Sequence, residues 1–428
     1  MNDLYPKKIY VELTTHCNLR CQMCVKYAAG SCIAEEDLPL AVFKGLAPSL
    51  AKAQTLILNG IGEPLLHPDL EEIIVFSRAN MASEAVIGFQ SNGILLDEEK
   101  SFQLISAGLS TVCLSLDSLE ATAEDQAGGH SLTAVSMAIA SLVAARKRVA
   151  ASHFRIGLEM VLSKKTIHEL PKLIQWATDH GADYIITTHL LHYDQSSVEL
   201  NLFNPNSSDA VDLFNSFNDR AKNLGIDLAD CLSSYLKYTK TQDDEAVLKL
   251  FRELQQESSD RDIRLHLQSL LVHKTNDADK IEQLFATARA VAEHNNIELF
   301  LPPHQALQQR SCPFMTDQAV FIAASGAVMP CHYLWHTYSC RLLGEEVEVQ
   351  ECPFGTIREQ SLLSIWQSPE YSLFRREAGE YDYSSCWSCS QGPCANLVND
   401  NILSANDCYG SQVPCGHCQW NLGGIRCL

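Results

Sequence analysis

Three cysteines, Cys17, Cys21 and Cys24, lie within eight residues near the start of the chain. They follow a short apolar run that predicts a β-strand, so the thiols occupy the loop that leaves this strand. Thiolates are the ligands of iron–sulfur clusters, and a cubane of four irons normally takes four of them. A loop with three thiols leaves one iron open, as a catalytic metal site keeps one coordination position free. A zinc loop or a chance cluster is the competing interpretation.

The elements that position this loop alternate regularly between strand and helix over the first 190 residues. Short apolar or β-branched runs are typical of strands buried on both faces, and helical periodicity fills the gaps. The expected strands are 9–14, 55–58, 86–90, 111–116, 155–162 and 184–188, and the expected helices are 38–52, 68–79, 97–107, 132–149 and 166–180. We expect Asp37 to cap the first helix and Gly181 to end the last. Six such units imply a parallel sheet, which is compatible with an open doubly wound sheet or a barrel segment.

Polar residues and glycines stand where these strands end. The loop after the second strand reads Asn59-Gly60-Ile61-Gly62-Glu63-Pro64, and its glycines let backbone groups approach a ligand closely. A buried glutamate in the fifth strand would be costly without a partner. The candidate ligand-contacting residues are Gly62, Glu63, Gln90, Asn92, Ser115, Asp117 and Glu159. Taken singly, the loop 59–64 also fits a plain Gly-Pro turn, and a Ser or Asp at a strand end is more often a helix cap.

The last quarter of the chain is rich in cysteine. Eleven of the seventeen cysteines lie between Cys312 and Cys427, and the chain shows no secretion signal. In a reducing compartment, clustered cysteines are metal ligands or catalytic thiols more often than disulfides. The candidate ligands are Cys312, Cys331, Cys386, Cys389, Cys394, Cys408, Cys415, Cys418 and Cys427, with Cys340 and Cys352 in reserve. Zinc is the competing metal, because two Cys-x2-Cys pairs approach the spacing of a zinc ribbon.

The motif Cys17-x3-Cys21-x2-Cys24 resembles the signature of the radical S-adenosylmethionine (SAM) enzymes, although Met23 stands where that family often has an aromatic residue. In that family the open iron chelates the amino and carboxylate groups of SAM, and an electron from the cluster cleaves SAM to a 5′-deoxyadenosyl radical. The resemblance implies a partial (β/α)6 TIM-like barrel with this [4Fe–4S] cluster at the carboxyl ends of the strands. It also implies that Gly62 and Glu63 receive the ammonium of SAM, and that Gln90, Asn92, Ser115, Asp117 and Glu159 face its methionine and ribose groups.

Cys312, the unit Gly326-x4-Cys331 and the segment 354–371 resemble the SPASM domain, an extension of many radical SAM enzymes. This second resemblance implies auxiliary [4Fe–4S] clusters, and the number of thiols leads us to expect two. The spacing after Cys389 departs from the usual pattern, so the assignment of thiols to clusters stays open. The expected domains are a radical SAM barrel over 1–195, a mostly helical insertion or bridging region over 196–310, and a SPASM-like domain over 311–428.

The composition limits the partners. A formal net charge of −20 disfavours nucleic acid and anionic membranes as partners, because both need clustered Lys and Arg. No apolar run of 18 residues occurs in the sequence, so we expect a cytoplasmic protein.

The closing run 414–428 resembles a SPASM subgroup of metalloenzyme maturases. Our hypothesis is therefore a maturase that abstracts hydrogen from a peptide or protein, supplied with electrons by a reductant such as flavodoxin or ferredoxin. Two alternatives remain: a ribosomal-peptide-modifying enzyme that forms a thioether or carbon–carbon crosslink or an epimer, and a non-catalytic iron–sulfur electron carrier or zinc scaffold.

Overall fold

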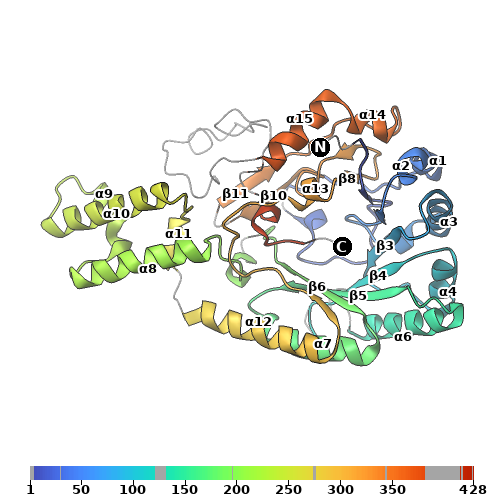
Figure 1. The fold of residues 1–428 in the computed structure, drawn as a ribbon, viewed down its shortest axis with the longest axis horizontal. Coiled ribbons are helices and arrows are strands. Elements are labelled where there is room, and N and C mark those ends of the chain that lie inside the picture. The colour runs from blue at the N-terminus through green and yellow to red at the C-terminus, as the bar shows by residue number, and fades with distance from the viewer. Residues whose placement is uncertain are drawn as a thin grey trace.

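Nine strands form one sheet in the computed structural model, which describes residues 4–428 except 29, 121–131, 195, 273–275, 343–344, 381–414, 416–417 and 427. Their order is β7-β6-β5-β4-β3-β2-β1-β8-β9, and the pairs from β7 to β8 are parallel. The first strands are β1 (Lys8–Val11), β2 (Thr55–Ile57), β3 (Val86–Ser91), β4 (Thr111–Ser115), β5 (Arg155–Leu162), β6 (Tyr184–His189) and β7 (Glu298–Phe300). The six expected βα units are present, and they form a partial barrel (Figure 1).

Helices connect consecutive strands and cover the outer face of this sheet (Figure 1). They are α1 (Leu40–Lys44), α2 (Ala47–Leu50), α3 (Leu70–Asn80), α4 (Glu98–Ser106), α6 (Leu132–Val149) and α7 (Leu170–His180). The prediction of one continuous helix over 38–52 is wrong. Pro48 has no N–H to bond the carbonyl of Lys44, so one helix ends there and a second begins at Ala47.

The predicted helix ends are confirmed in part. Asp37 does not cap the first helix but forms a β-bridge with Thr14 at the end of the first strand segment. Gly181 ends α7 with a φ of 91°, a left-handed conformation that favours glycine.

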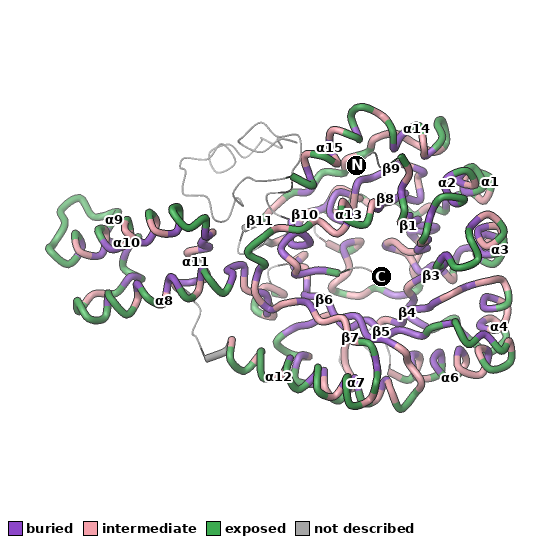
Figure 2. The backbone as a smooth tube through the Cα atoms, viewed as in Figure 1, coloured by how far each residue is buried: buried purple, intermediate pink, exposed green. Residues whose placement is uncertain are grey.

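The parallel register brings the carboxyl ends of β1 to β5 to one edge of the sheet. Ser115 at the end of β4 lies opposite Glu159 on β5, and Ser91 at the end of β3 lies opposite Leu114. Residues along β4, β5 and β6 are almost all buried, because helices pack on one face of the sheet and the other face lines the barrel interior (Figure 2). Residues that follow the strands are therefore held in place by a rigid scaffold.

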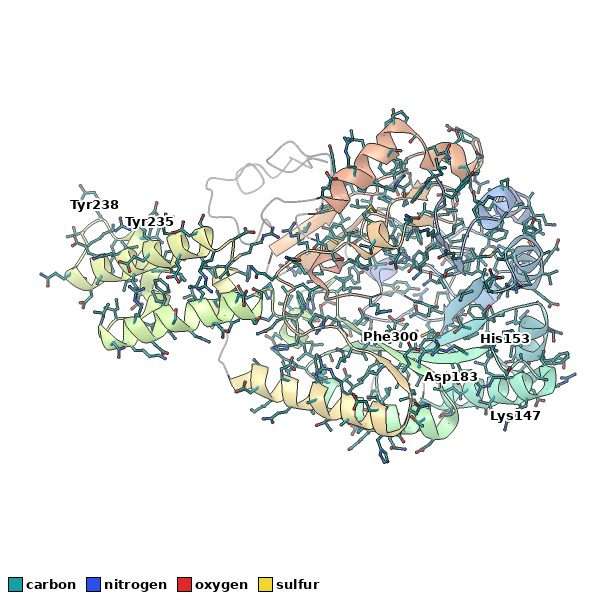
Figure 3. All side chains as sticks on the ribbon, in the orientation of Figure 1. Lys147, His153, Asp183, Tyr235, Tyr238 and Phe300 are labelled. Atoms are coloured by element: carbon teal, nitrogen blue, oxygen red, sulfur yellow. The ribbon has the colours of Figure 1, made fainter. Side chains whose placement is uncertain are left out.

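A helical arm projects from the barrel (Figures 1 and 2). It consists of α8 (Ser208–Asn223), α9 (Cys231–Leu236), α10 (Gln242–Asp260) and α11 (Leu267–Val272), with a small apolar core of its own. Tyr235 and Tyr238 lie at its far end, 71% and 103% exposed (Figure 3). The chain then returns through α12 (Asn276–His294), which packs on α7, to β7 beside β6.

The C-terminal part continues the barrel sheet. β8 (Ala319–Ile322) pairs parallel with β1, and β9 (Val328–Met329) folds back antiparallel on β8. Around it lie α13 (Pro313–Thr316), the hairpin β10 (Tyr338–Leu342) and β11 (Glu345–Val349), α14 (Leu362–Trp366) and α15 (Pro369–Gly379). β8, which lies between Cys312 and Cys331, therefore sits directly against the first barrel strand.

Among the described residues, no helix is both long enough and apolar enough to cross a lipid bilayer.

Candidate active site

The loop that carries the first three cysteines leaves β1 at the carboxyl edge of the sheet. Cys24 N–H donates to the carbonyl of Cys21 at 3.1 Å, which closes a turn before the short helix η1 (Val25–Tyr27). Burial raises the pKa of both Cys17 and Cys24, and the nearby Cys17 thiol adds to the rise at Cys24. Half-buried thiols that lie close together on one loop suit a metal cluster, because binding to the metal stabilises them as thiolates.

Lys26 places a positive charge beside these thiols. Its side chain is 7% exposed, and its ammonium donates to the carbonyl of Thr15 at 2.7 Å and to Glu35 at 2.9 Å. The ammonium lowers the pKa of Cys17 and Cys24, in opposition to their burial. Sequence analysis missed this residue, because a single lysine near a cysteine motif carries no signal of its own.

The loop from Asn59 to Pro64 packs against residues 14–16, which follow β1. A Cβ atom at Gly62 would lie 2.2 Å from the carbonyl oxygen of Thr14 and 2.6 Å from that of His16, so no other residue fits without moving backbone. The N–H of Glu63 donates to the carbonyl of His16 at 2.8 Å. The two loops thus share one surface, with Gly62 at their contact.

Glu63 is buried, and its carboxylate is held by three donors. Ser91 Oγ donates to it at 2.8 Å, the N–H of Asn92 at 2.9 Å and the N–H of Leu65 at 3.2 Å. Burial raises the pKa of Glu63, while these hydrogen bonds oppose the rise. The side chain of Asn92 in turn donates to Asn18 on the cysteine loop at 2.7 Å. Glu63 therefore joins the loops after β2 and β3, a role that its sequence position did not reveal.

Gln90, Ser115, Asp117 and Glu159 also come together at this edge. Gln90 donates to Ser115 Oγ at 3.3 Å, and Asp117 accepts the N–H of Val161 at 2.9 Å. Burial raises the pKa of Glu159 to about 8, and the nearby negative charge of Asp117 adds to the rise. At neutral pH the Glu159 carboxyl is therefore mostly protonated.

The raised pKa of Glu159 predicts a pH-dependent stability. Between the unfolded pKa of 4.5 and the folded value of about 8, the native state holds a proton that the unfolded chain releases, so the free energy of unfolding falls as pH rises. We expect Glu159→Gln to remove up to about 1.4 kcal/mol of this loss per pH unit in that window. Urea denaturation at pH 5.5 and 7.5 measures the difference, with exposed Glu370→Gln as the control. An equal pH dependence in wild type and Glu159→Gln would contradict the assignment.

Four thiols of the C-terminal part form a second group. Cys312 precedes α13, Cys331 follows β9, and Cys415 and Cys418 are joined by a 3.2 Å hydrogen bond between the N–H of Cys418 and the Cys415 carbonyl. Burial raises the pKa of each thiol. The charges of Cys312 and Cys418 raise it further at Cys331, and those of Cys418, Cys331 and Cys312 do so at Cys415. The spacing of this sequence pattern did not predict that these four belong together.

Arg310 supports this group, since its positive charge lowers the pKa of Cys415 and Cys418. Of the reserve cysteines, Cys340 is buried on β10, where burial raises its pKa to about 12, and Cys352 is half-buried. The remaining candidates Cys386, Cys389, Cys394, Cys408 and Cys427 lie outside the described residues.

The two groups of thiols fit iron–sulfur clusters, and the polar residues at the strand ends fit a ligand that carries oxygen and nitrogen atoms. In the described ranges, no three His, Cys, Asp or Glu side chains converge as ligands of a single metal ion would. A cubane differs, because its ligand sulfurs surround a body of eight atoms and need not meet at a point. Asn59 Oδ1, after β2, and Glu159 Oε2, on β5, are buried without a hydrogen-bond partner among the described residues. Such buried polar atoms suit a polar ligand.

Two family profiles match the chain. That of the radical SAM superfamily covers residues 11–177, and that of the SPASM iron–sulfur cluster-binding domain covers residues 312–390. The chain is a radical SAM enzyme with a SPASM domain. The interpretation as a non-catalytic electron carrier or zinc scaffold is therefore wrong. The enzyme takes a [4Fe–4S] cluster and SAM, and its SPASM domain is an iron–sulfur cluster-binding domain.

Relatives of this radical SAM enzyme differ in how much of it they match. A "Tungsten-containing aldehyde ferredoxin oxidoreductase cofactor-modifying protein" of Pyrococcus furiosus is 25% identical over 425 residues, covering 98% of this chain and 97% of that protein. A "PqqA peptide cyclase" of Gluconobacter oxydans is 28% identical over 190 residues, covering 44% of this chain and 50% of that protein. The crystal structure of Streptococcus suis SuiB bound to S-adenosylmethionine aligns over 93% of this chain and 75% of that chain, with 11% identity and a TM-score of 0.48.

The contact at Gly62 gives a direct prediction for this radical SAM enzyme. We expect Gly62→Ala to weaken SAM binding at least about tenfold, because the added Cβ must push the loop away from Thr14 and His16. Equilibrium dialysis of SAM with anaerobic protein provides the measurement. Gly379→Ala is the matched control, since its added Cβ would lie 3.9 Å from Met315 Cβ, an ordinary van der Waals contact. Unchanged SAM affinity in Gly62→Ala would show that this loop does not shape the cofactor site.

Proposed function

We propose that this radical SAM enzyme modifies a protein that carries a metal cofactor, or the cofactor itself, and so acts as a metalloenzyme maturase. The observation that carries the proposal is the match over 98% of the chain to the Pyrococcus furiosus protein, whose name describes the modification of an oxidoreductase cofactor. A match over 98% of the chain includes the helical arm, whereas the match to PqqA peptide cyclase covers 44% of the chain.

In this proposal, the first three cysteines hold the cluster and leave one iron for SAM. Bound SAM supplies a carbon radical that abstracts a hydrogen atom from the substrate. The loop at Gly62 bounds the methionine end, and Glu63 fixes that loop to Ser91 and Asn92 rather than contacting SAM directly. Gln90, Ser115 and Glu159 line the barrel interior, where buried side chains keep water from the reaction.

Cys312, Cys331, Cys415 and Cys418 hold one auxiliary cluster in the same proposal. Their mutual proximity and the positive charge of Arg310 support it. A second auxiliary cluster, on the cysteines outside the described residues, stays a prediction from the sequence. A flavodoxin or ferredoxin supplies the electron that starts the reaction.

The substrate proposal is tested by anaerobic pull-down from cells that express the tagged protein. The enriched partner is then incubated with enzyme, SAM and dithionite and examined by mass spectrometry. We expect a metal-cofactor protein to be enriched and to change mass, in the chain or in its extracted cofactor. A short ribosomal peptide that loses hydrogens or gains a crosslink would favour the peptide-modifying alternative, which the partial match to PqqA peptide cyclase supports.

A further inference from the structure

A buried carboxylate joins the loop 59–64, called here the cofactor loop, to the segment around Cys331, one of the thiols proposed to hold the auxiliary cluster. Glu12 directly follows β1 and is fully buried. Its carboxylate accepts the N–H of Ile61 at 2.9 Å from the loop after β2, and the N–H of Ala324 at 3.2 Å from the turn after β8. His336 Nε2 lies 3.1 Å from the same carboxylate, and it donates because a carboxylate only accepts.

The absence of a side chain at Gly60 leaves room for the Glu12 carboxylate. A Cβ atom at Gly60 would lie 2.4 Å from Glu12 Cγ and 2.5 Å from Glu12 Oε1, so glycine lets the side chain pass beneath the loop. A buried carboxylate without donors would be costly. Three donors from three separate segments satisfy Glu12, and each segment is thereby fixed to the others.

Two of these donors bracket an auxiliary thiol. Ala324 precedes Cys331 by seven residues through the β8–β9 turn, and His336 follows it by five residues. The third donor, Ile61, is the neighbour of Gly62 on the cofactor loop. A cluster ligated by Cys331 would therefore restrict the motion of both Ala324 and His336, the two C-terminal donors to Glu12. Because Glu12 also accepts the N–H of Ile61, it would restrict the motion of the loop 59–64 as well.

We propose that the Glu12–His336 pair couples the auxiliary cluster site to the SAM loop, so that SAM binds more tightly when the auxiliary thiols hold their cluster. The proposal rests on the proposed position of SAM at Gly62. Glu12 and His336 are positioning residues, since they act through the backbone of Ile61. Loss of His336 leaves the carboxylate with two backbone donors and removes the hydrogen bond between Glu12 and the loop 330–337.

The experiment measures the SAM dissociation constant of the anaerobic, iron-loaded full chain from the change in the electron paramagnetic resonance spectrum of the reduced cluster. The variants are His336→Ala, His336→Gln, the pair Cys331→Ala/Cys418→Ala, and the triple variant that combines that pair with His336→Ala. His153→Ala is the control, an exposed histidine before β5 (Figure 3). Glutamine is the conservative replacement, because its amide can still donate to Glu12. Circular dichroism verifies that each variant is folded, and iron content shows which clusters each variant holds.

We expect His336→Ala and the cysteine pair each to raise the SAM dissociation constant about tenfold, and the triple variant to show no further rise, because all three break one connection. His336→Gln should recover most of the affinity. Multiplied effects in the triple variant, or an unchanged affinity in His336→Ala, would overturn the coupling. If the wild type cleaves SAM and these variants bind SAM with normal affinity, the coupling through Glu12 and His336 is wrong but the proposed function stands. If the wild type cannot cleave SAM, the proposed function itself is wrong.

Discussion

In the Cys21→Ala variant, we expect reduced protein and SAM to yield no measurable 5′-deoxyadenosine, a fall of at least about a thousandfold. Cys21 lies in the turn between Cys17 and Cys24, so its loss leaves two thiols for a cluster that needs three from the protein. Iron content should fall by about four atoms per chain, the content of one cubane. Chromatographic quantification of 5′-deoxyadenosine after dithionite reduction is the measurement.

The control for Cys21→Ala is Cys32→Ala. Cys32 is exposed and lies on the same stretch of chain, eleven residues after Cys21. We expect this variant to keep both its iron and its activity. Equal 5′-deoxyadenosine formation in Cys21→Ala and wild type would remove the basis for assigning the cleavage to this loop.

The second large effect concerns the C-terminal thiols. In the Cys331→Ala/Cys418→Ala variant, we expect a loss of about four irons per chain. Slow SAM cleavage should continue in excess SAM, because the three thiols near the amino terminus remain, but modification of the substrate should stop. Burial and mutual charge raise the pKa of Cys331 and Cys418 above the ordinary value of a thiol, so these side chains need the iron of a cluster to be held as thiolates.

Iron analysis and Mössbauer spectroscopy of the iron-57-loaded protein measure this effect. Cys231→Ala is the control, since that buried thiol belongs to the helical arm, remote in sequence from both groups. If the double variant kept the full iron content, the four thiols would not be the ligands of one auxiliary cluster.

Much of the barrel could be predicted, because each strand and helix carries its own local pattern. The residues at the strand ends were predicted for the same reason, since parallel strands bring their carboxyl ends to one edge. The wrong prediction of one helix over 38–52 also came from a local pattern. The apolar periodicity continues through Pro48, but the missing N–H of this proline interrupts the helix.

The contacts between distant segments could not be predicted. Glu12 reads as one charge in an apolar strand, and its donors Ile61, Ala324 and His336 lie 49 to 324 residues away. The contact of Glu63 with SAM stays a prediction, and the hydrogen bonds of its carboxylate with Ser91 and Asn92 were not predicted. Such partners follow from the fold as a whole, and a single sequence carries no signal for them.

The most direct test of the central claim asks whether SAM occupies the open iron of the cluster held by the first three cysteines. Electron–nuclear double resonance of the reduced enzyme with SAM labelled with nitrogen-15 at its amino group gives the answer. The account predicts a hyperfine coupling between that nitrogen and the cluster, which disappears in Cys21→Ala. A cluster whose spectrum is unchanged by labelled SAM, or one that carries a fourth protein ligand at that iron, would contradict it.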